Sequence, residues 1–102
     1  MGFKRDGTPH DNLTAEEVRA RYSYDPTTGI LRHTDYVSNR PHRHGREVGC
    51  ISKYGYRLLR LGNRNHMVHR IIWLHFYGEY PPEFIDHINR IKDDNRICNL
   101  RA

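Results

Sequence analysis

The pattern that most limits how this chain can fold lies at residues 69–77, where apolar side chains surround most of a helix. Such a segment predicts a buried helix. Gly78 can end it with a positive φ, and Pro81-Pro82 prevents it from continuing. Because only 36% of the 102 residues are hydrophobic, we expect one domain with a thin core around this helix. The apolar residues that we expect to be buried are Ile71, Ile72, Trp73, Leu74 and Phe76.

The residues before this helix predict a shorter helix and a small antiparallel sheet. Thr14 and Glu17 form a capping box, which predicts a helix at about residues 15–22. The turn residues of 24–29, with Pro26 and Gly29, lead into a returning strand. The strands expected from composition and turn positions are residues 30–33, 47–51, 56–61 and 65–68. In the third of these, partial alternation favours Leu58 facing the core, with a bulge or twist near Leu59.

The charge of the chain favours a polyanionic partner. Seventeen Lys and Arg against twelve Asp and Glu give a net charge of +5, with a pI near 9.5, and the excess lies mainly in residues 32–70. Cations at phosphates release condensed counterions, so nucleic acid is the expected partner, although a solvated basic surface is the alternative. On a small sheet, arginines could enter a major groove. The candidates for phosphate contact are Arg57, Arg60, Arg64, Lys92 and Arg96.

Several classes of protein are disfavoured. No run approaches the roughly 18 apolar residues of a membrane span, and no apolar stretch follows the start as in a signal peptide. A soluble, intracellular, cytoplasmic protein is therefore expected. Cys50 and Cys98 lack the spacing of a zinc knuckle, and we interpret both as small buried apolar residues that form no disulfide.

The C-terminal residues carry the chemistry. Asp86-His87 stands twelve residues before Asn99, and an aspartate can hold a hard divalent cation while a neighbouring histidine removes a proton from water. Alone, such a pair is more often a surface salt link or a turn. We expect a hairpin here, with strands at residues 84–88 and 97–100 and a charged turn at residues 92–96.

These residues resemble the core of the His-Asn-His (HNH) endonucleases of the phage and homing type. Upstream segments are similar to phage HNH proteins in the same order, so the resemblance covers about residues 13 to 101. It implies an α+β fold, in which a small antiparallel sheet with helices precedes a C-terminal ββα-metal (HNH) hairpin. The segments that carry it include Ile85-Asp86-His87-Ile88-Asn89, Asp94-Asn95-Arg96-Ile97, Asn99-Leu100-Arg101, Tyr24-Asp25-Pro26-Thr27-Thr28-Gly29 and His69-Arg70-Ile71-Ile72-Trp73-Leu74.

The resemblance also implies roles and partners. Asp86 matches the family's metal-binding aspartate, His87 its general base, and Asn99 the asparagine that orients the histidine and braces the hairpin. The implied cofactor is Mg2+ or Mn2+, and the implied substrate is double-stranded DNA rather than a small molecule. A phage gene expressed in a bacterial host would fit. His69 matches a family histidine too, but we interpret it as a helix-start residue.

The sequence departs from the family pattern in two places. The last position of the motif, a His or Asn about nine residues beyond Asn99, would lie past Ala102, so the hairpin is expected to be truncated. Three explanations are open: the polypeptide is a fragment, the missing ligand comes from another chain, or nuclease activity has been lost. Arg90 stands where the family commonly has Gly, which predicts a strained turn. Two alternatives to a nuclease therefore stay open: a non-catalytic DNA-binding remnant, and a subunit whose site is completed by oligomerisation.

The expected organisation is one compact domain in three stretches. Residues 1–12 are expected to be a flexible leader. Residues 13–68 would form the N-terminal helix and a basic, DNA-binding antiparallel sheet. Residues 69–102 would hold the buried helix and the partial HNH motif.

Overall fold

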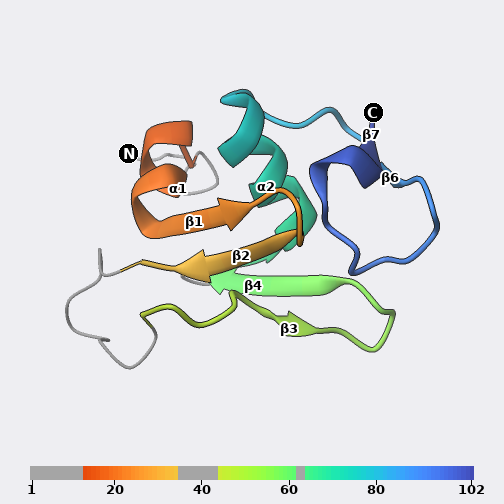
Figure 1. Cartoon of the computed structure of the whole chain (residues 1–102), viewed down its shortest axis with the longest axis horizontal. Helices are drawn as coiled ribbons and strands as arrows, with labels where there is room; N and C mark the ends of the chain where they lie inside the picture. Colours follow the sequence, from red (N-terminus) through yellow and green to blue (C-terminus); the bar gives the residue numbers. More distant parts are fainter. Residues whose placement is uncertain (1–12, 35–43, 62–63) are drawn as a thin grey trace.

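The computed structural model describes residues 13–34, 44–61 and 64–102. The expected leader and residues 35–43 of the basic region therefore lie outside the described residues. The expected α+β fold is confirmed, with helices and small antiparallel sheets (Figure 1). Along the chain the elements are α1 (Ala15–Arg21), β1 (Tyr22–Asp25), β2 (Ile30–His33), β3 (Cys50–Ile51), β4 (Arg57–Leu61), β5 (Arg64–Met67), α2 (Val68–Tyr77), β6 (Asp86–His87), η3 (Ile97–Asn99, a 3-10 turn) and β7 (Leu100–Arg101).

Helix α1 begins at the predicted cap. The Thr14 Oγ1 accepts a hydrogen bond of 3.1 Å from the Glu17 amide, which satisfies one of the unpaired amides of the first turn. Val18, on the inward face of this helix, is fully buried. The helix ends at Arg21, one residue before the expected end, because Tyr22 already lies in an extended strand.

Strand β1 was not expected, since the sequence pattern indicated helix and then turn. It pairs antiparallel with β2, from Tyr22 opposite His33 to Asp25 opposite Ile30. The turn between them is built by Asp25, whose Oδ1 accepts from the Thr27 amide at 3.0 Å and the Thr27 hydroxyl at 2.6 Å. This turn carries the hairpin toward the C-terminal segment.

The sheet β3-β4-β5 is antiparallel and shorter than expected at its first strand. β3 covers Cys50 and Ile51, whereas Glu47 contributes a single bridge to Arg32. The β4–β5 ladder runs in continuous register past Leu59, so of the expected bulge or twist the bulge is wrong. Leu59, 7% exposed, is the buried residue of this strand, in place of Leu58.

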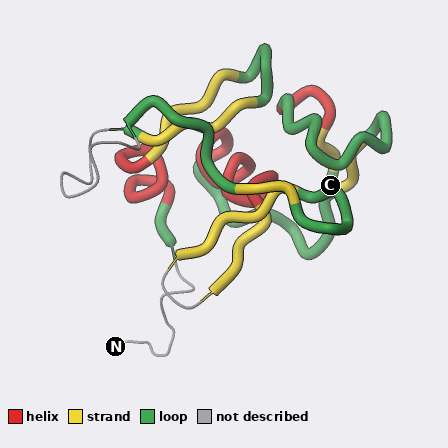
Figure 2. The backbone as a smooth tube through the Cα atoms, turned by 90° about the horizontal axis from the view of Figure 1, so that it is seen from below, coloured by secondary structure: helices red, strands yellow, loops and turns green. Residues whose placement is uncertain are grey.

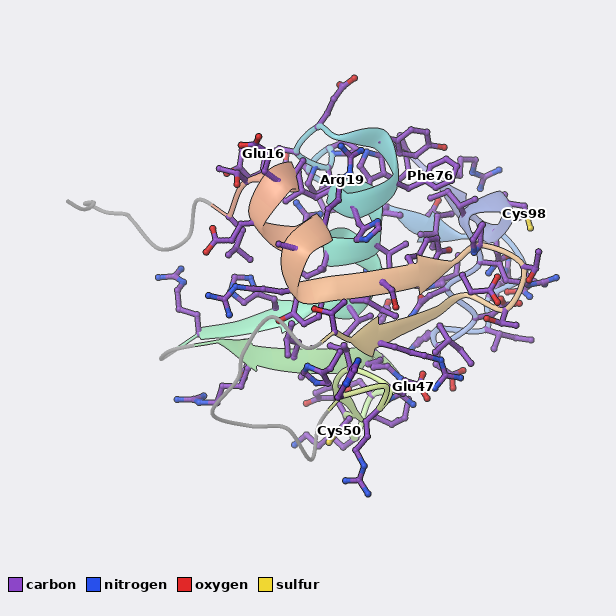
Figure 3. All side chains as sticks on the ribbon, turned by 60° about the vertical axis from the view of Figure 1, so that its left-hand side comes forward. Glu16, Arg19, Glu47, Cys50, Phe76 and Cys98 are labelled. Atoms are coloured by element: carbon purple, nitrogen blue, oxygen red, sulfur yellow. The ribbon has the colours of Figure 1, made fainter. Side chains whose placement is uncertain are left out.

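Helix α2 is the central packed element, as predicted from its apolar pattern. It contacts α1, β1, β4, β5 and η3, and Figure 2 shows helical turns between strands on either side. Its partner α1 is linked to it by Arg19, whose Nε donates to the His75 carbonyl at 2.8 Å (Figure 3). The buried core consists of Val18, Tyr22, Leu31, Val48, Leu59, Val68, Ile71, Ile72, Leu74 and Leu100.

The end of α2 also follows the prediction, but two of the side chains expected to be buried are not. Gly78 is left-handed at φ +75° and its amide bonds the Leu74 carbonyl at 2.9 Å. Phe76 is 44% exposed, and its ring lies edge-on to those of Tyr24 and Tyr77. Trp73 is partly buried and packs against the core from outside it. Among the described residues, no helix has the length and apolar content needed to cross a membrane.

The cysteines are not buried as expected. Cys50 and Cys98 are both exposed and both are free thiols. Figure 3 shows them well apart, with Cys50 on β3 and Cys98 on η3 near the C-terminus. Each lies on a short element, the two-residue strand β3 or the 3-10 turn η3, and the sequence alone did not indicate which of its side chains would face solvent.

A pair of glycines tests the contact between the β1–β2 turn and the C-terminal segment. Gly29 and Gly45 both have positive φ, +77° and +82°, so alanine at either position costs about 1–2 kcal/mol in backbone strain. At Gly29 an added Cβ would also lie 2.5 Å from the backbone nitrogen of Arg96, whereas at Gly45 it would meet no atom within 4 Å. We predict that Gly29→Ala lowers the free energy of unfolding in urea by clearly more than Gly45→Ala does. Equal losses would contradict the close approach.

Candidate functional site

The Asp86-His87 pair lies on β6, which pairs antiparallel with β7. Asp86 is opposite Arg101 and His87 is opposite Leu100. The expected strands were longer; in the structure residues 97–99 form the 3-10 turn η3 instead of a strand. The Ile88 amide donates to the Asn99 carbonyl at 2.8 Å, which closes the loop between the two short strands. Residues 88–99 are therefore held mainly by side chains.

Asn99 is the brace of this loop. Its Oδ1 accepts from the Asn89 amide at 3.0 Å, and its Nδ2 donates to the Asn89 Oδ1 and the Asp94 carbonyl, both at 2.9 Å. Asn99 is 5% exposed, so these bonds are shielded from water and replace a longer ladder. That Asn99 also orients the histidine stays a prediction, since the side-chain bonds described for Asn99 go to Asn89 and Asp94.

The His87 ring is bonded to a different asparagine. Its Nε2 lies 2.8 Å from the Asn95 Oδ1, and Asn95 is 2% exposed. Asn95 belongs to a motif segment, but no role for it could be predicted, because it lies eight positions from His87 across an irregular loop. The one available indication was its place between Asp94 and Arg96 in a motif segment.

Two aromatic rings complete the surroundings of His87. The ring centroid of His69 lies 4.9 Å away in an edge-on arrangement, and that of Tyr56 lies 6.0 Å away. His69 is the second residue of α2, as predicted for a helix-start residue, and it is 5% exposed. Burial, with nearby His87 and Arg70, lowers the pKa of His69 to about 4. His69 is therefore neutral at pH 7 and adds no positive charge beside His87.

Asp86, in contrast, faces solvent. Its side chain is 69% exposed, and its Oδ2 lies 3.5 Å from a guanidinium nitrogen of Arg101, which is 62% exposed. An ion pair this exposed contributes little to stability, so the carboxylate is available to another cation. On a strand, successive side chains leave on opposite faces, which explains why Asp86 is exposed while the His87 ring packs inward.

The loop between β6 and η3 is held by Asp94. Its carboxylate accepts hydrogen bonds from Arg96 Nε at 2.8 Å, from an Arg96 terminal nitrogen at 2.7 Å, and from the side-chain Nδ2 of Asn89 at 2.8 Å. These bonds, that from Arg96 first, hold the pKa of Asp94 well below its usual range. At the preceding turn Arg90 has φ +66°, which confirms the expected positive-φ position where the family commonly has Gly.

The comparisons with known proteins bear on this same stretch. Residues 66–102, from the last residues of β5 to the end of β7, match the family model described as HNH endonuclease. Over this stretch the chain is similar to HNH endonucleases, and residues 66–102 are called the HNH segment below. Searches of curated proteins and of solved structures found no match. The match indicates a nuclease or DNA-related function, and HNH domains generally use a divalent metal.

The HNH segment offers few ligands for such a metal. Among the described residues, no group of three or more His, Cys, Asp or Glu side chains is placed to hold an ion. The exposed Asp86 carboxylate is nevertheless the kind of oxygen ligand that Mg2+ prefers. Because Mg2+ is often held by one or two carboxylates together with water and substrate phosphate, Asp86 fits as one ligand of such a site.

The five cationic candidates differ in their surroundings. Arg57 donates to the Gly49 carbonyl at 2.9 Å and pairs with Glu47 at 3.3 Å. Lys92, on the HNH segment, donates to the Tyr54 carbonyl at 3.0 Å, and its Nζ lies 5.0 Å from the Tyr56 ring centroid. Arg96 is engaged by Asp94, as described above. Arg60 and Arg64 are exposed on β4 and β5, near the end of their ladder.

The Asp94 bonds predict an acid-dependent loss of stability. The pKa of Asp94 is depressed in the folded chain, so its stabilising contribution is present above the unfolded-state pKa near 4 and is lost as pH falls toward the folded value. We predict that Asp94→Asn lowers the free energy of unfolding at pH 7 and flattens its decline between about pH 5 and pH 2. Urea denaturation across that range measures both effects. The neighbouring Asp93→Asn serves as the matched control, and an equal effect of the two variants would contradict the assignment.

Proposed function

We propose that this chain is a metal-dependent DNA endonuclease that hydrolyses phosphodiester bonds at the Asp86-His87 pair. The observation that supports this most directly is the contrast between these two neighbours within the HNH segment. The Asp86 carboxylate is exposed, whereas the His87 ring is fixed by Asn95 on its Nε2 side. A solvent-facing carboxylate beside a held imidazole supplies a cation ligand and a proton acceptor in adjacent positions.

In this proposal His87 is the general base. A neutral imidazole can accept a proton from the water that attacks phosphorus, while the P–O bond to the 3′ oxygen breaks. His69, kept neutral by burial, spares this base the repulsion of a second imidazolium. Asn99 braces the loop that follows His87, through its hydrogen bonds to Asn89 and Asp94.

Asp86 would hold the divalent ion, for which we propose Mg2+ or Mn2+. When bound, such an ion stabilises the negative charge that develops on the phosphate and the leaving oxygen. Arg101 lies 3.5 Å from Asp86 and shares the carboxylate through a solvent-exposed pair. Because that pair is weak, the Arg101 side chain can move to a neighbouring phosphate when a cation takes the carboxylate.

The proposed partner is double-stranded DNA, in a cytoplasmic setting. The net charge of +5 supports binding to a polyanion. Among the predicted phosphate contacts, Arg60 and Arg64 extend from exposed positions on β4 and β5. Arg57, Lys92 and Arg96 hold neighbouring loops through the bonds described above, so we propose that their contact with phosphate is coupled to those loops. The resemblance to phage and homing-type proteins supports a mobile or phage gene as the origin.

The main competing function is DNA binding without turnover, and the presence of one exposed carboxylate at the pair is the observation that favours it. A metal held by one protein ligand binds weakly. A second copy of the chain could supply a further ligand, in which case activity would rise steeply with protein concentration. Binding in a gel-shift assay, together with no nicking at any Mg2+ or Mn2+ concentration, would support binding alone.

Plasmid nicking tests the catalytic pair. We predict that nicking of supercoiled DNA requires Mg2+ or Mn2+, and that His87→Ala lowers its rate by about 100-fold or more, as expected for loss of a general base. Asp86→Ala should raise the Mg2+ concentration needed for half-maximal nicking. The exposed His44→Ala controls for the loss of an imidazole elsewhere. Unchanged nicking in His87→Ala would rule out the assigned base.

DNA affinity as a function of salt tests the basic sheet. We predict that Arg60→Ala weakens binding of duplex DNA and lowers the slope of log K against log salt by about 1, as expected for one phosphate contact. Its free energy of unfolding should stay within about 0.5 kcal/mol of the parent. Arg57→Ala is the contrasting variant, because loss of its bonds to Gly49 and Glu47 should also lower stability. An unchanged salt slope in Arg60→Ala would place the DNA elsewhere.

A further inference from the structure

We propose that Asn95 is a positioning residue for His87 and that the β1–β2 hairpin holds Asn95 in place. This inference rests on the proposed nuclease function for its catalytic consequence, but its structural content concerns the imidazole alone. The hairpin, residues 22–33, lies outside the stretch that matches the HNH family model. The placement of Asn95, and through it that of the general base His87, would thus depend on residues outside the matched stretch.

The first contact is that between the two side chains. The Asn95 Oδ1 is an acceptor, so the His87 Nε2 at 2.8 Å must carry the hydrogen. The neutral ring then keeps its lone pair on Nδ1, which is the nitrogen able to take a proton from water. Because Asn95 is 2% exposed, water cannot readily replace its oxygen as the partner of Nε2.

The second contact fixes the backbone of the same asparagine. The Tyr24 hydroxyl, on β1, donates to the Asn95 carbonyl at 2.6 Å. Burial raises the pKa of Tyr24 to about 12, so the hydroxyl keeps its proton throughout the neutral range. The Tyr24 ring makes edge-on contacts with His75 and Phe76 of α2, at centroid distances of 6.1 and 6.4 Å, which limits its movement.

The third contact comes from the turn of the same hairpin. Gly29 is buried against the peptide that joins Asn95 and Arg96; a Cβ at Gly29 would lie 2.6 Å from the Asn95 carbonyl carbon and 2.5 Å from the Arg96 nitrogen. The hairpin therefore touches this peptide at two points, one polar and one steric. Together they fix where the Asn95 side chain begins, and so where it meets the His87 ring.

The tautomer of His87 tests the inference independently of catalysis. In the full chain with 15N-labelled histidine, two-bond 1H–15N spectra at mildly alkaline pH distinguish a hydrogen on Nε2 from one on Nδ1. We expect the Nε2–H form in the parent, and a mixture of both forms in Asn95→Leu, which keeps similar bulk but removes the acceptor. Asn95→Asp retains an oxygen acceptor and should retain the Nε2–H form.

The hairpin is tested with a matched pair of tyrosine variants. Tyr24→Phe removes the hydroxyl that bonds Asn95, whereas Tyr77→Phe removes one from a half-exposed tyrosine on α2. We expect Tyr24→Phe to shift the His87 tautomer signals toward those of Asn95→Leu, and Tyr77→Phe to leave them unchanged. Both changes are small, so folding should survive in both variants.

The kinetics of DNA nicking measure the catalytic effect of the same variants. Asn95→Leu should lower kcat by about 10- to 100-fold, as loss of an orienting partner of a histidine commonly does, and Tyr24→Phe by about 3- to 10-fold. The KM for DNA should change less than twofold, because neither residue is expected to contact DNA.

The outcomes separate the two proposals. A parent chain without nicking would overturn the proposed function, while the tautomer spectra would still decide the role of Asn95. A parent-like Nε2–H form in Asn95→Leu would overturn the positioning role even if nicking were strong. If Asn95→Leu fails to fold, the spectra of Tyr24→Phe and Asn95→Asp decide in the same way.

Discussion

The packing of α2 against α1, β1, β4, β5 and η3 is the contact through which the short elements of this chain become one structure. Its side chains contribute much of the buried core, with Ile72 fully excluded from solvent. None of the sheets is large enough to be stable alone, since an isolated pair of short strands is marginal in water. The helix therefore provides the common apolar surface on which the N-terminal hairpin, the β3-β4-β5 sheet and the HNH segment assemble.

Where this core ends, polar side chains take over. The loop from β6 to β7 is held by hydrogen bonds among Asn89, Asp94, Arg96 and Asn99, and it includes a left-handed Arg90. A non-glycine residue in that region costs of order 1 kcal/mol or more and persists where its surroundings determine it. Since the amide network determines this turn, the loop can present Asp86 and His87 without a long β-ladder or a large apolar surface.

The sequence predicted what depends on local pattern. The cap at Thr14, the apolar helix with its end at Gly78, and the location of Asp86 and His87 on a strand of a hairpin were all readable from spacing and residue type. What it could not predict depends on contacts distant in the chain. β1 forms because Tyr22 is buried beneath α2, and Leu59 rather than Leu58 faces the core because the register of β4 is set by β5.

The site shows the same division. The residue types at Asp86 and His87 indicate their chemistry, but the partner of the His87 ring depends on how an irregular loop folds back, which no periodicity describes. Arg57 likewise was expected at phosphate, and its pairing with Glu47 depends on two strands meeting. The exposure of Cys50 and Cys98 depends on how much chain happens to cover them.

The contacts of Tyr24 and Gly29 with the Asn95–Arg96 peptide have a consequence for how such a chain can evolve. A recombination event that joined residues 66–102 alone to a new N-terminal half would transfer Asp86, His87 and the hydrogen-bonded loop. It would leave behind Tyr24 and Gly29, which contact the Asn95–Arg96 peptide. The new N-terminal half would need a hydrogen-bond donor for the Asn95 carbonyl and a residue without a Cβ where Gly29 approaches this peptide. The unit that can be exchanged between genes without loss therefore begins upstream of β1.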